Sequence, residues 1–538
     1  MKFILYIYVI LFLFGCSVSQ SDESNVFRYN ESNGITSLDP AFARDLEIMW
    51  ATNQIFDGLV EMNEKLEVVP CIAKSWNISE DGKTYTFIIR DNVYFHSSPL
   101  FADSSNRKVT AHDFEYSFSR IINPKVASPG SWIFSKVDTT TNGGFEALND
   151  STFSIHLKNP FQPFLGMLSM QYCNVVPKEV VEHYGADFRS HPIGTGPFKF
   201  AFWYENIALV FHKNQNFWQK DEAGNTLPYL DAIKIDFVKD MSVEYQGLLM
   251  NKYDFMSGIH NSYKDELLST QGELNDSYKE KFTFYKLPFI KTDYIGFMID
   301  PQSEVASSSP FLNSKVRKAI EFAIDKKEMV RYLRNNTVVA AEQGFIPPGL
   351  LVEDSLLSEF NIEKAMQLLD EAGYPKGKGL PEFTISTTGD YADLIEYIQH
   401  SLNKIGLKVK VQVMQGGTFR EATSKGQLAV FRKSWLADYA DPENFFSLFL
   451  SENFCPNGPN YCHYSNKEFD ILYNKAITTT SESERNVLYK EMNRMISEET
   501  PMIPLYYDQV SHFVSKSIEN WHINPINLID LKKVRKMR

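Results

Sequence analysis

The segment WLADYADPENF, residues 435–445, places a large indole three residues before one carboxylate and a second carboxylate directly before a proline. Pro442 disfavours helical backbone at Asp441, so we expect a loop or a strand end here. A carboxylate beside an aromatic wall suits the binding of a cation such as a primary amine. The same residues also fit an aromatic-rich turn whose aspartates accept hydrogen bonds from nearby backbone amides. The local sequence leaves both interpretations open.

The residues before this segment alternate between strand and helix signals. Residues 383–387 have strand composition, residues 394–405 carry one apolar helical face, and residues 407–413 alternate apolar with polar side chains. Strand, helix and strand form a βαβ unit, which predicts an α/β domain that binds ligands near the carboxyl ends of its strands. Residues 431–434 run directly into Trp435, so the segment should lie just beyond a strand end.

Composition narrows the class of protein. The chain has 538 residues, enough for about two to four domains. Its formal net charge of −13 argues against nucleic acid and against an anionic membrane surface as partners, because both require a basic face. The basic cluster at residues 532–538 is interpreted as a solvated tail.

The N-terminus predicts export and a lipid anchor. Residues 3–14 are apolar and uncharged, but too short to span a bilayer, which needs about 20 such residues. We therefore interpret residues 1–15 as a signal peptide. The run ends in the letters LFGC, which resemble a bacterial lipobox, so Cys16 is the predicted lipidation site and residues 16–26 a lipid-anchored linker. An ordinary cleaved signal with an incidental cysteine is the alternative.

Export to an oxidising compartment permits disulfides among the remaining cysteines, Cys71, Cys173, Cys455 and Cys462. Cys455 and Cys462 enclose a loop rich in turn-forming residues, which predicts a local disulfide. A metal site formed by these two cysteines and His463 is the alternative, although no second Cys/His pair has a matching spacing.

Several stretches in the first half have clear local signals. Residues 33–40 predict a strand running into a turn, and Asp81-Gly82 predicts a β-hairpin. Thr110 and Asp113 have the spacing of a helix N-cap and its capping box, with His112 on the surface of the first turn.

Seven motifs follow one another along the chain and together resemble the peptide-binding subgroup of the extracellular solute-binding proteins of ABC transporters. The resemblance extends from about residue 33 to residue 507. The motifs are S-L-D-P (37–40), P-x-x-A-x-S-W-x-x-S-x-D-G-x-x-Y-x-F-x-x-R (70–90), V-T-A-x-D-F-x-Y-S-F (109–118), G-T-G-P-F (194–198), N-x-x-aromatic-W with P-x-L-D (214–218 and 228–231), V-R-x-A-I-x-x-A-I-D (316–325) and W-x-x-D-Y-x-D-P (435–442).

This resemblance implies a periplasmic-binding-protein-like type II fold, in which two α/β lobes close on a hinge. Lobe I would contain residues 27–56, 193–289 and 509–538, with an extra domain at 57–192, and lobe II would contain 290–508. The family implies a monomer outside the cytoplasmic membrane that binds peptides without a cofactor and delivers them to an ABC permease. An extended peptide would pair with backbone in the cleft and leave its side chains in hydrated pockets.

The resemblance also implies ligand-binding residues. Asp438 matches the carboxylate that binds the ligand α-amino group, with the Trp435 ring beside it. Arg432 matches a basic residue that faces ligand carboxylates in some members. The remaining predicted contacts are Tyr439 in the same segment, and Arg44 and Leu46 in the 41–46 segment, where Arg44 stands near a position at which the family supplies an acidic side chain.

Patterns typical of catalytic sites are missing from the sequence. There is no G-x-S-x-G and no H-E-x-x-H, and residues 373–379 lack the spacing of a P-loop. A binding protein is therefore favoured over an enzyme. Because one fold serves many ligands, a nickel chelate, haem or a sugar remains an alternative ligand, and an exported hydrolase is a more distant alternative.

Overall fold

The computed structural model describes residues 25–537 except 103–106, 141, 261 and 352–358. The predicted signal peptide, the predicted lipidation site Cys16 and most of the predicted linker lie outside the described residues. Among the described residues, no helix has the length and apolar character needed to cross a membrane.

One large mixed sheet of 11 strands runs through the whole molecule. Its strand order is β15-β14-β16-β12-β17-β11-β1-β10-β9-β8, and β13 pairs with β17 off this path. The strands are β1 (Val26–Asn30), β8 (Phe198–Tyr204), β9 (Ala208–Lys213), β10 (Ala232–Asp236), β11 (Phe255–Ser257), β12 (Phe282–Phe297), β13 (Val339–Ala340), β14 (Phe383–Thr388), β15 (Val409–Met414), β16 (Val430–Leu436) and β17 (Met502–Ser515).

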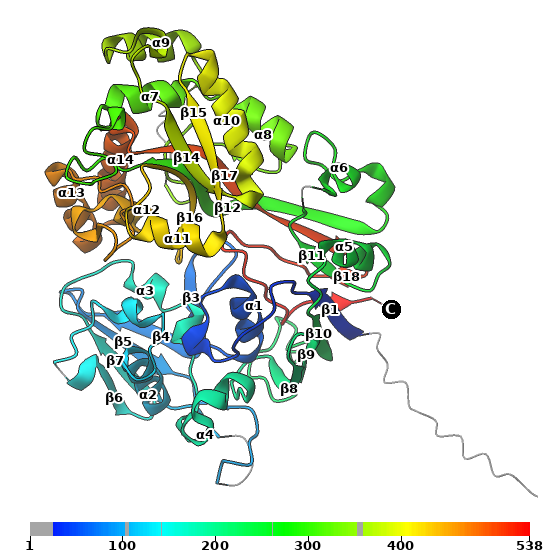
Figure 1. Ribbon diagram of the computed structural model, residues 1–538. Helices are drawn as coiled ribbons and strands as arrows, with labels where there is room; N and C mark the ends of the chain where they lie inside the picture. Colours follow the sequence, from blue (N-terminus) through cyan, green and yellow to red (C-terminus); the bar gives the residue numbers. More distant parts are fainter. Residues whose placement is uncertain (1–24, 103–106, 141, 261, 352–358, 538) are drawn as a thin grey trace, which may run out of the picture.

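Figure 1 shows two halves, which we call upper and lower. The lower half contains β1–β10 and the helices α1 (Leu46–Ile55), α2 (Ala111–Ile122), α3 (Phe164–Met167) and α4 (Lys178–Tyr184). The upper half contains β13–β16 and the helices α7 (Ser314–Phe322), α8 (Lys326–Arg334), α9 (Ile362–Glu371), α10 (Ala392–Lys404), α11 (Gly416–Ser424), α12 (Glu443–Phe446), α13 (Lys467–Thr478) and α14 (Glu482–Glu499). The short helices α5 (Met241–Leu249) and α6 (Lys264–Leu267) lie beside the junction.

The long antiparallel strands β12 and β17 connect the two halves. Their pairing is interrupted between Pro288 and Thr292, and the register shifts again between Asp293 and Tyr294. At this interruption, Lys291 Nζ lies 2.7 Å from Asp508 Oδ2. Such an irregularity bends and twists a strand pair locally.

The lower half has its own antiparallel sheet of four strands, in the order β4-β5-β7-β6. Asp81-Gly82 closes the hairpin between β4 and β5, as predicted. The strands of the lower half outside the large sheet are β2 (Val60–Met62), β3 (Val68–Pro70), β4 (Ala73–Ile78), β5 (Thr84–Ile89), β6 (Phe145–Asn149) and β7 (Thr152–His156).

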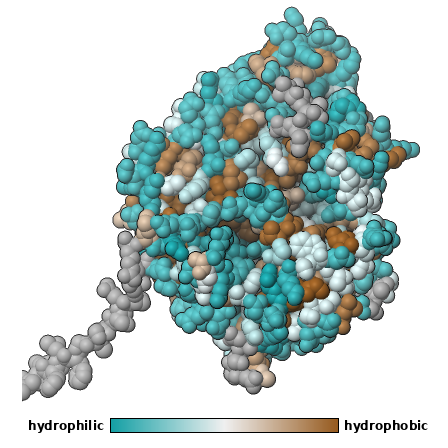
Figure 2. Space-filling model, turned by 180° about the vertical axis from the view of Figure 1, so that it is seen from behind, coloured by the Kyte–Doolittle hydropathy of each residue, from teal (hydrophilic) through white to brown (hydrophobic). Residues whose placement is uncertain are grey.

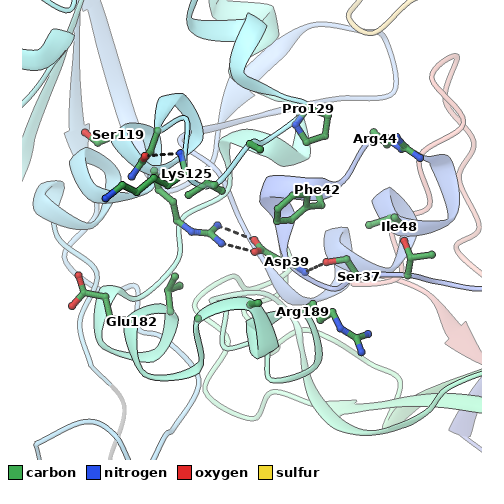
Figure 3. A pocket seen from close by; sticks show the side chains of 18 of the residues that line it. Ser37, Asp39, Phe42, Arg44, Ile48, Ser119, Lys125, Pro129, Glu182 and Arg189 are labelled. Carbon is green, nitrogen blue, oxygen red and sulfur yellow. Dashed lines mark hydrogen bonds and ion pairs between the residues drawn. The ribbon is translucent and has the colours of Figure 1, made fainter.

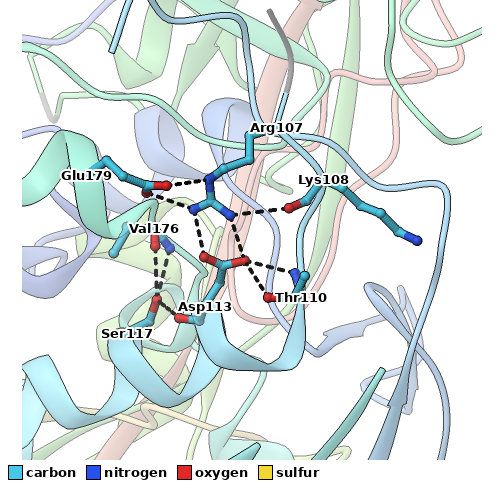
Figure 4. Close-up of polar contacts among 7 residues, drawn as sticks. All are labelled: Arg107, Lys108, Thr110, Asp113, Ser117, Val176 and Glu179. Atoms are coloured by element: carbon cyan, nitrogen blue, oxygen red, sulfur yellow. Dashed lines mark hydrogen bonds and ion pairs between the residues drawn. The ribbon is translucent and has the colours of Figure 1, made fainter. Parts of the chain in front are cut away.

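Helix α2 covers this sheet, and its predicted capping box is confirmed. The Asp113 carboxylate accepts the Thr110 backbone N–H at 2.8 Å. Arg107 donates to Asp113 at 2.7 Å and to Glu179 of α4 at 3.0 Å, which ties the start of α2 to α4 (Figure 4). His112 is exposed on the first turn, as predicted.

The predicted βαβ unit is confirmed in the upper half. Strands β14 and β15 are parallel and joined through α10, and β14 also contacts β16 in parallel. For residues 33–40, in contrast, the predicted strand is wrong, although the turn that was predicted to follow it is present. These residues join no sheet, and Pro40–Phe42 forms a 3-10 turn instead. The Asp39 carboxylate caps this turn by accepting the Ala41 N–H and is held by Arg120 Nη1 at 2.9 Å, which fixes a turn in place of a strand.

Candidate functional site

The 435–445 segment lies where the two halves meet. Trp435 is the penultimate residue of β16 and pairs with Thr292 of β12, and the chain leaves the sheet after Leu436. The Ala437 N–H then donates to the Ile290 carbonyl at 3.0 Å, inside the interrupted part of β12. The prediction that this segment follows a strand end is therefore confirmed. Figure 2 shows hydrophobic side chains across the middle of the rear face, at the level of this junction.

Asp438 is a carboxylate with a raised pKa and no ion pair to the described residues. Its side chain is open to solvent, yet the surrounding protein removes enough water to raise its pKa to about 6. A hydrogen bond with Asn444 offsets this effect only in part. No cationic side chain among the described residues forms an ion pair with Asp438. A ligand ammonium group would supply the missing partner.

Asn444 links Asp438 to the neighbouring indole. Its Oδ1 accepts the Trp435 Nε1–H at 2.8 Å, while its side chain also interacts with the Asp438 carboxylate. One amide therefore fixes the indole and orients the carboxylate. The sequence analysis did not single out Asn444, although a side-chain amide next to a turn-forming D-P-E was the available signal.

Tyr439 faces the protein interior. Its hydroxyl donates to Glu443, which also accepts the hydroxyl of Tyr473. Asp441 accepts the Glu443 N–H at 2.9 Å and the Tyr489 hydroxyl at 2.8 Å. Burial raises the pKa of Glu443 to about 7, and its two tyrosine hydrogen bonds counteract this rise. The network holds the backbone that carries Asp438, and it leaves only the ring of Tyr439 for other contacts.

Arg432 already has a protein partner. It is 5% exposed and forms an ion pair with the fully buried Asp293. Its guanidinium carbon lies 3.1 Å from the centre of the Tyr391 ring, and burial lowers its pKa to about 10. A ligand carboxylate would have to compete with Asp293 for this charge, so the predicted ligand contact of Arg432 stays a prediction. Asp293 was not foreseen.

The two predicted contacts of the lower half lie at the start of α1. Arg44 is exposed, and its Nε lies 3.1 Å from Asp45 Oδ2. Leu46 is the first residue of α1 and lines a cavity of about 420 Å³, which Glu31, Glu47 and Glu244 also line. The ligand contacts of Arg44 and Leu46 stay predictions, because the geometry does not test them.

A larger cavity, of about 960 Å³, lies within the lower half between residues 36–48 and the helices α2 and α4. Arg44 and Phe42 line it on one side and Lys125 on the other, and the Asp39–Arg120 ion pair forms part of its wall (Figure 3). Asp438 does not line this cavity. The cavity is therefore distinct from the site at the 435–445 segment, although Arg44 borders it.

The predicted disulfide is wrong in this structure, because Cys455 and Cys462 are both free. Their sulfur atoms have different partners: Cys455 Sγ lies 3.2 Å from His463 Nε2, and Cys462 Sγ donates to the Pro501 carbonyl at 3.4 Å. Across the described ranges, no group of three or more His, Cys, Asp or Glu side chains is placed to hold a metal ion.

Comparisons with known proteins agree on one family. The family profile described as bacterial extracellular solute-binding proteins, family 5 Middle, matches residues 67–454. The dipeptide-binding protein DppE of Bacillus subtilis is 27% identical over 96% of this chain and 92% of its own. The heme-binding protein A of Haemophilus influenzae is 27% identical over 90% of this chain and 88% of its own. The periplasmic binding protein DppA of Helicobacter pylori, solved with the peptide STSA, is 26% identical, with a TM-score of 0.75 over 95% of this chain and 98% of that one.

Proposed function

Because the chain belongs to family 5 of the bacterial extracellular solute-binding proteins, whose fold is a two-lobe clamp, we propose that it captures peptides outside the cytoplasmic membrane and delivers them to an ABC import permease. The observation that carries the peptide proposal is Asp438. It is a carboxylate with a raised pKa and an adjacent indole, and no described side chain neutralises it.

The physical argument concerns hydration. An ammonium group that enters a closing cleft loses much of its water, and this loss is offset only if a carboxylate contacts it. Asp438 has already lost part of its hydration in the folded protein, so less desolvation free energy remains to be spent when it pairs with a cation. Trp435 can add a cation–π contribution to the same ammonium group. A free amino terminus is the one cation that all unmodified linear peptides share.

The clamp is proposed to divide as the sequence suggested, with lobe I at 27–56, 193–289 and 509–538, the extra domain at 57–192 and lobe II at 290–508. The register shift between Pro288 and Thr292, and the Lys291–Asp508 ion pair, support a hinge at the proposed lobe boundaries. In the same proposal, Cys16 carries a lipid that keeps the protein at the membrane.

Native mass spectrometry of the purified protein, followed by calorimetry with any co-purified ligand, tests the peptide proposal. We expect co-purified peptides, and we expect a free peptide to bind more tightly than its N-acetylated form. A haem, a nickel chelate or a sugar as the co-purified ligand would refute the peptide proposal while leaving the family assignment intact.

A further inference from the structure

Tyr172 lies in the lower half, in the 3-10 turn Gln171–Cys173, which packs against α1 and the turn Pro40–Phe42. Its side chain is 5% exposed. The ring fills the space next to Gly130, where an added Cβ would lie only 2.3 Å from Tyr172 Cδ1. A glycine at this position thus allows the ring to take this orientation.

Nothing in the protein uses the Tyr172 hydroxyl as a hydrogen-bond partner, as far as the described residues show. The charged groups around it come from both halves: Asp438 from the upper half, and Asp45 and Arg44 from the lower half. Burial and, next, the negative charge of Asp438 raise the pKa of Tyr172, so its hydroxyl stays protonated and neutral at physiological pH.

A neighbouring contact confirms that the two halves meet here. The Trp132 ring, two residues after Gly130, lies 6.3 Å from the Tyr439 ring, which adjoins Asp438. The Gln162 N–H also donates across the junction to the Ile477 carbonyl at 3.0 Å. A tyrosine hydroxyl with no hydrogen bond to the described residues therefore lies on the lower side of the junction, and a carboxylate with no ion pair to them lies on the upper side.

We propose that the Tyr172 hydroxyl is a second contact for the ligand ammonium group, made from the lower lobe opposite Asp438. This inference rests on the proposed function and adds to it a residue that determines specificity. An ammonium group has three N–H donors, and Asp438 satisfies one or two of them. The Tyr172 oxygen accepts another through a lone pair. A ligand that contacts both lobes favours the closed form, so the same amine that is recognised also promotes closure.

The test is Tyr172→Phe, which removes the hydroxyl and keeps the ring next to Gly130. Calorimetry would compare one peptide in its free and N-acetylated forms. A hydrogen bond to a charged group predicts a loss of about tenfold or more in affinity for the free peptide and no change for the acetylated peptide. Tyr184→Phe on α4 is the matched control, because the Tyr184 ring stacks on His191 within the lower half, and it should change neither affinity.

Three outcomes would overturn the inference. If Tyr172→Phe weakens both peptides equally, the residue has only a structural role. If it changes neither affinity while the wild type still prefers the free peptide, the proposed function stands and Tyr172 is not a contact. If the wild type binds the two forms equally, amine recognition at Asp438 fails, and the Tyr172 inference fails with it. In the Asp438→Asn background, Tyr172→Phe should cost less than in the wild type, since the two residues would hold the same group.

Discussion

Asp438→Asn removes one negative charge and almost no volume, and it keeps a side chain that can still bond with Asn444. Breaking a buried charge pair by removing one member costs about 3–5 kcal/mol, whereas solvent-exposed pairs contribute about 0–1 kcal/mol. The Asp438 side chain is open to solvent in this structure, yet its pKa is raised to about 6 by lost hydration. We therefore expect a cost between these limits, about 2–3 kcal/mol, or roughly a hundredfold weaker binding of a free peptide.

The assay is calorimetry on wild type and Asp438→Asn, each with the free and the N-acetylated form of one peptide. Acetylation should weaken binding to the wild type by a similar factor. It should add little in the variant, because the interaction that it removes is already gone. Thermal unfolding of both proteins checks that the substitution leaves the fold intact.

Asp441→Asn is the matched control, three residues further along. Asp441 is 8% exposed and accepts hydrogen bonds from the Glu443 backbone and from the Tyr489 hydroxyl. Its substitution should lower thermal stability but preserve the preference for a free amine. Equal affinity of the wild type for free and acetylated peptide, or a loss of this preference in Asp441→Asn alone, would refute the assignment of Asp438 as the amine partner.

Three further expectations can be measured. Because the pKa of Asp438 is raised to about 6, its carboxylate becomes neutral as the pH falls from 7 to 5, while a peptide amine stays protonated. The affinity for a free peptide should therefore fall over this pH range in the wild type and not in Asp438→Asn. A pH dependence shared by both proteins would contradict this. Gly130→Ala should displace the Tyr172 ring and cost about 1–3 kcal/mol of stability. Gly166→Ala should cost none, because nothing lies within 4 Å of its added Cβ. Equal melting temperatures of the two variants would contradict the proposed packing. Cys16→Ser should release the protein from membranes, as fractionation would show, because lipid anchoring contributes about 0.8 kcal/mol per buried methylene; a membrane-bound variant would refute the anchor.

Local sequence signals predicted local structure well. The Asp81-Gly82 hairpin, the Thr110–Asp113 capping box and the βαβ unit around α10 all depend on residues that are close in sequence, and the structure contains each of them. The residues before the turn at Pro40–Phe42 form no strand, and Arg120 holds the Asp39 cap of this turn from 81 positions away. Such a long-range ion pair leaves no periodic signal in the sequence.

The same distinction separates the predicted part of the site from the unforeseen part. Asp438 and Trp435 could be nominated because they share a short motif that resembles a known family. Asp293 and Tyr172 could not, since they approach Arg432 and Asp438 only after the chain has folded. The disulfide prediction failed for a related reason. The sequence separation of Cys455 and Cys462 does not determine where their sulfur atoms point, and in the structure the two sulfur atoms have different partners.

The position of Asp438 relative to the hinge has a mechanical consequence. Ala437, its neighbour, donates to the carbonyl of Ile290, and the Ile290 N–H donates to the Pro525 carbonyl. The backbone that carries Asp438 is thus tied to β12 within its interruption, and on the other side the Glu443 and Asp441 network holds it. Rotation of the upper half would therefore carry Asp438 as part of a rigid unit. An amine bound to Asp438 would then contact the residue of the lower half that faces Asp438. The choice of ligand would therefore depend on which residue that is.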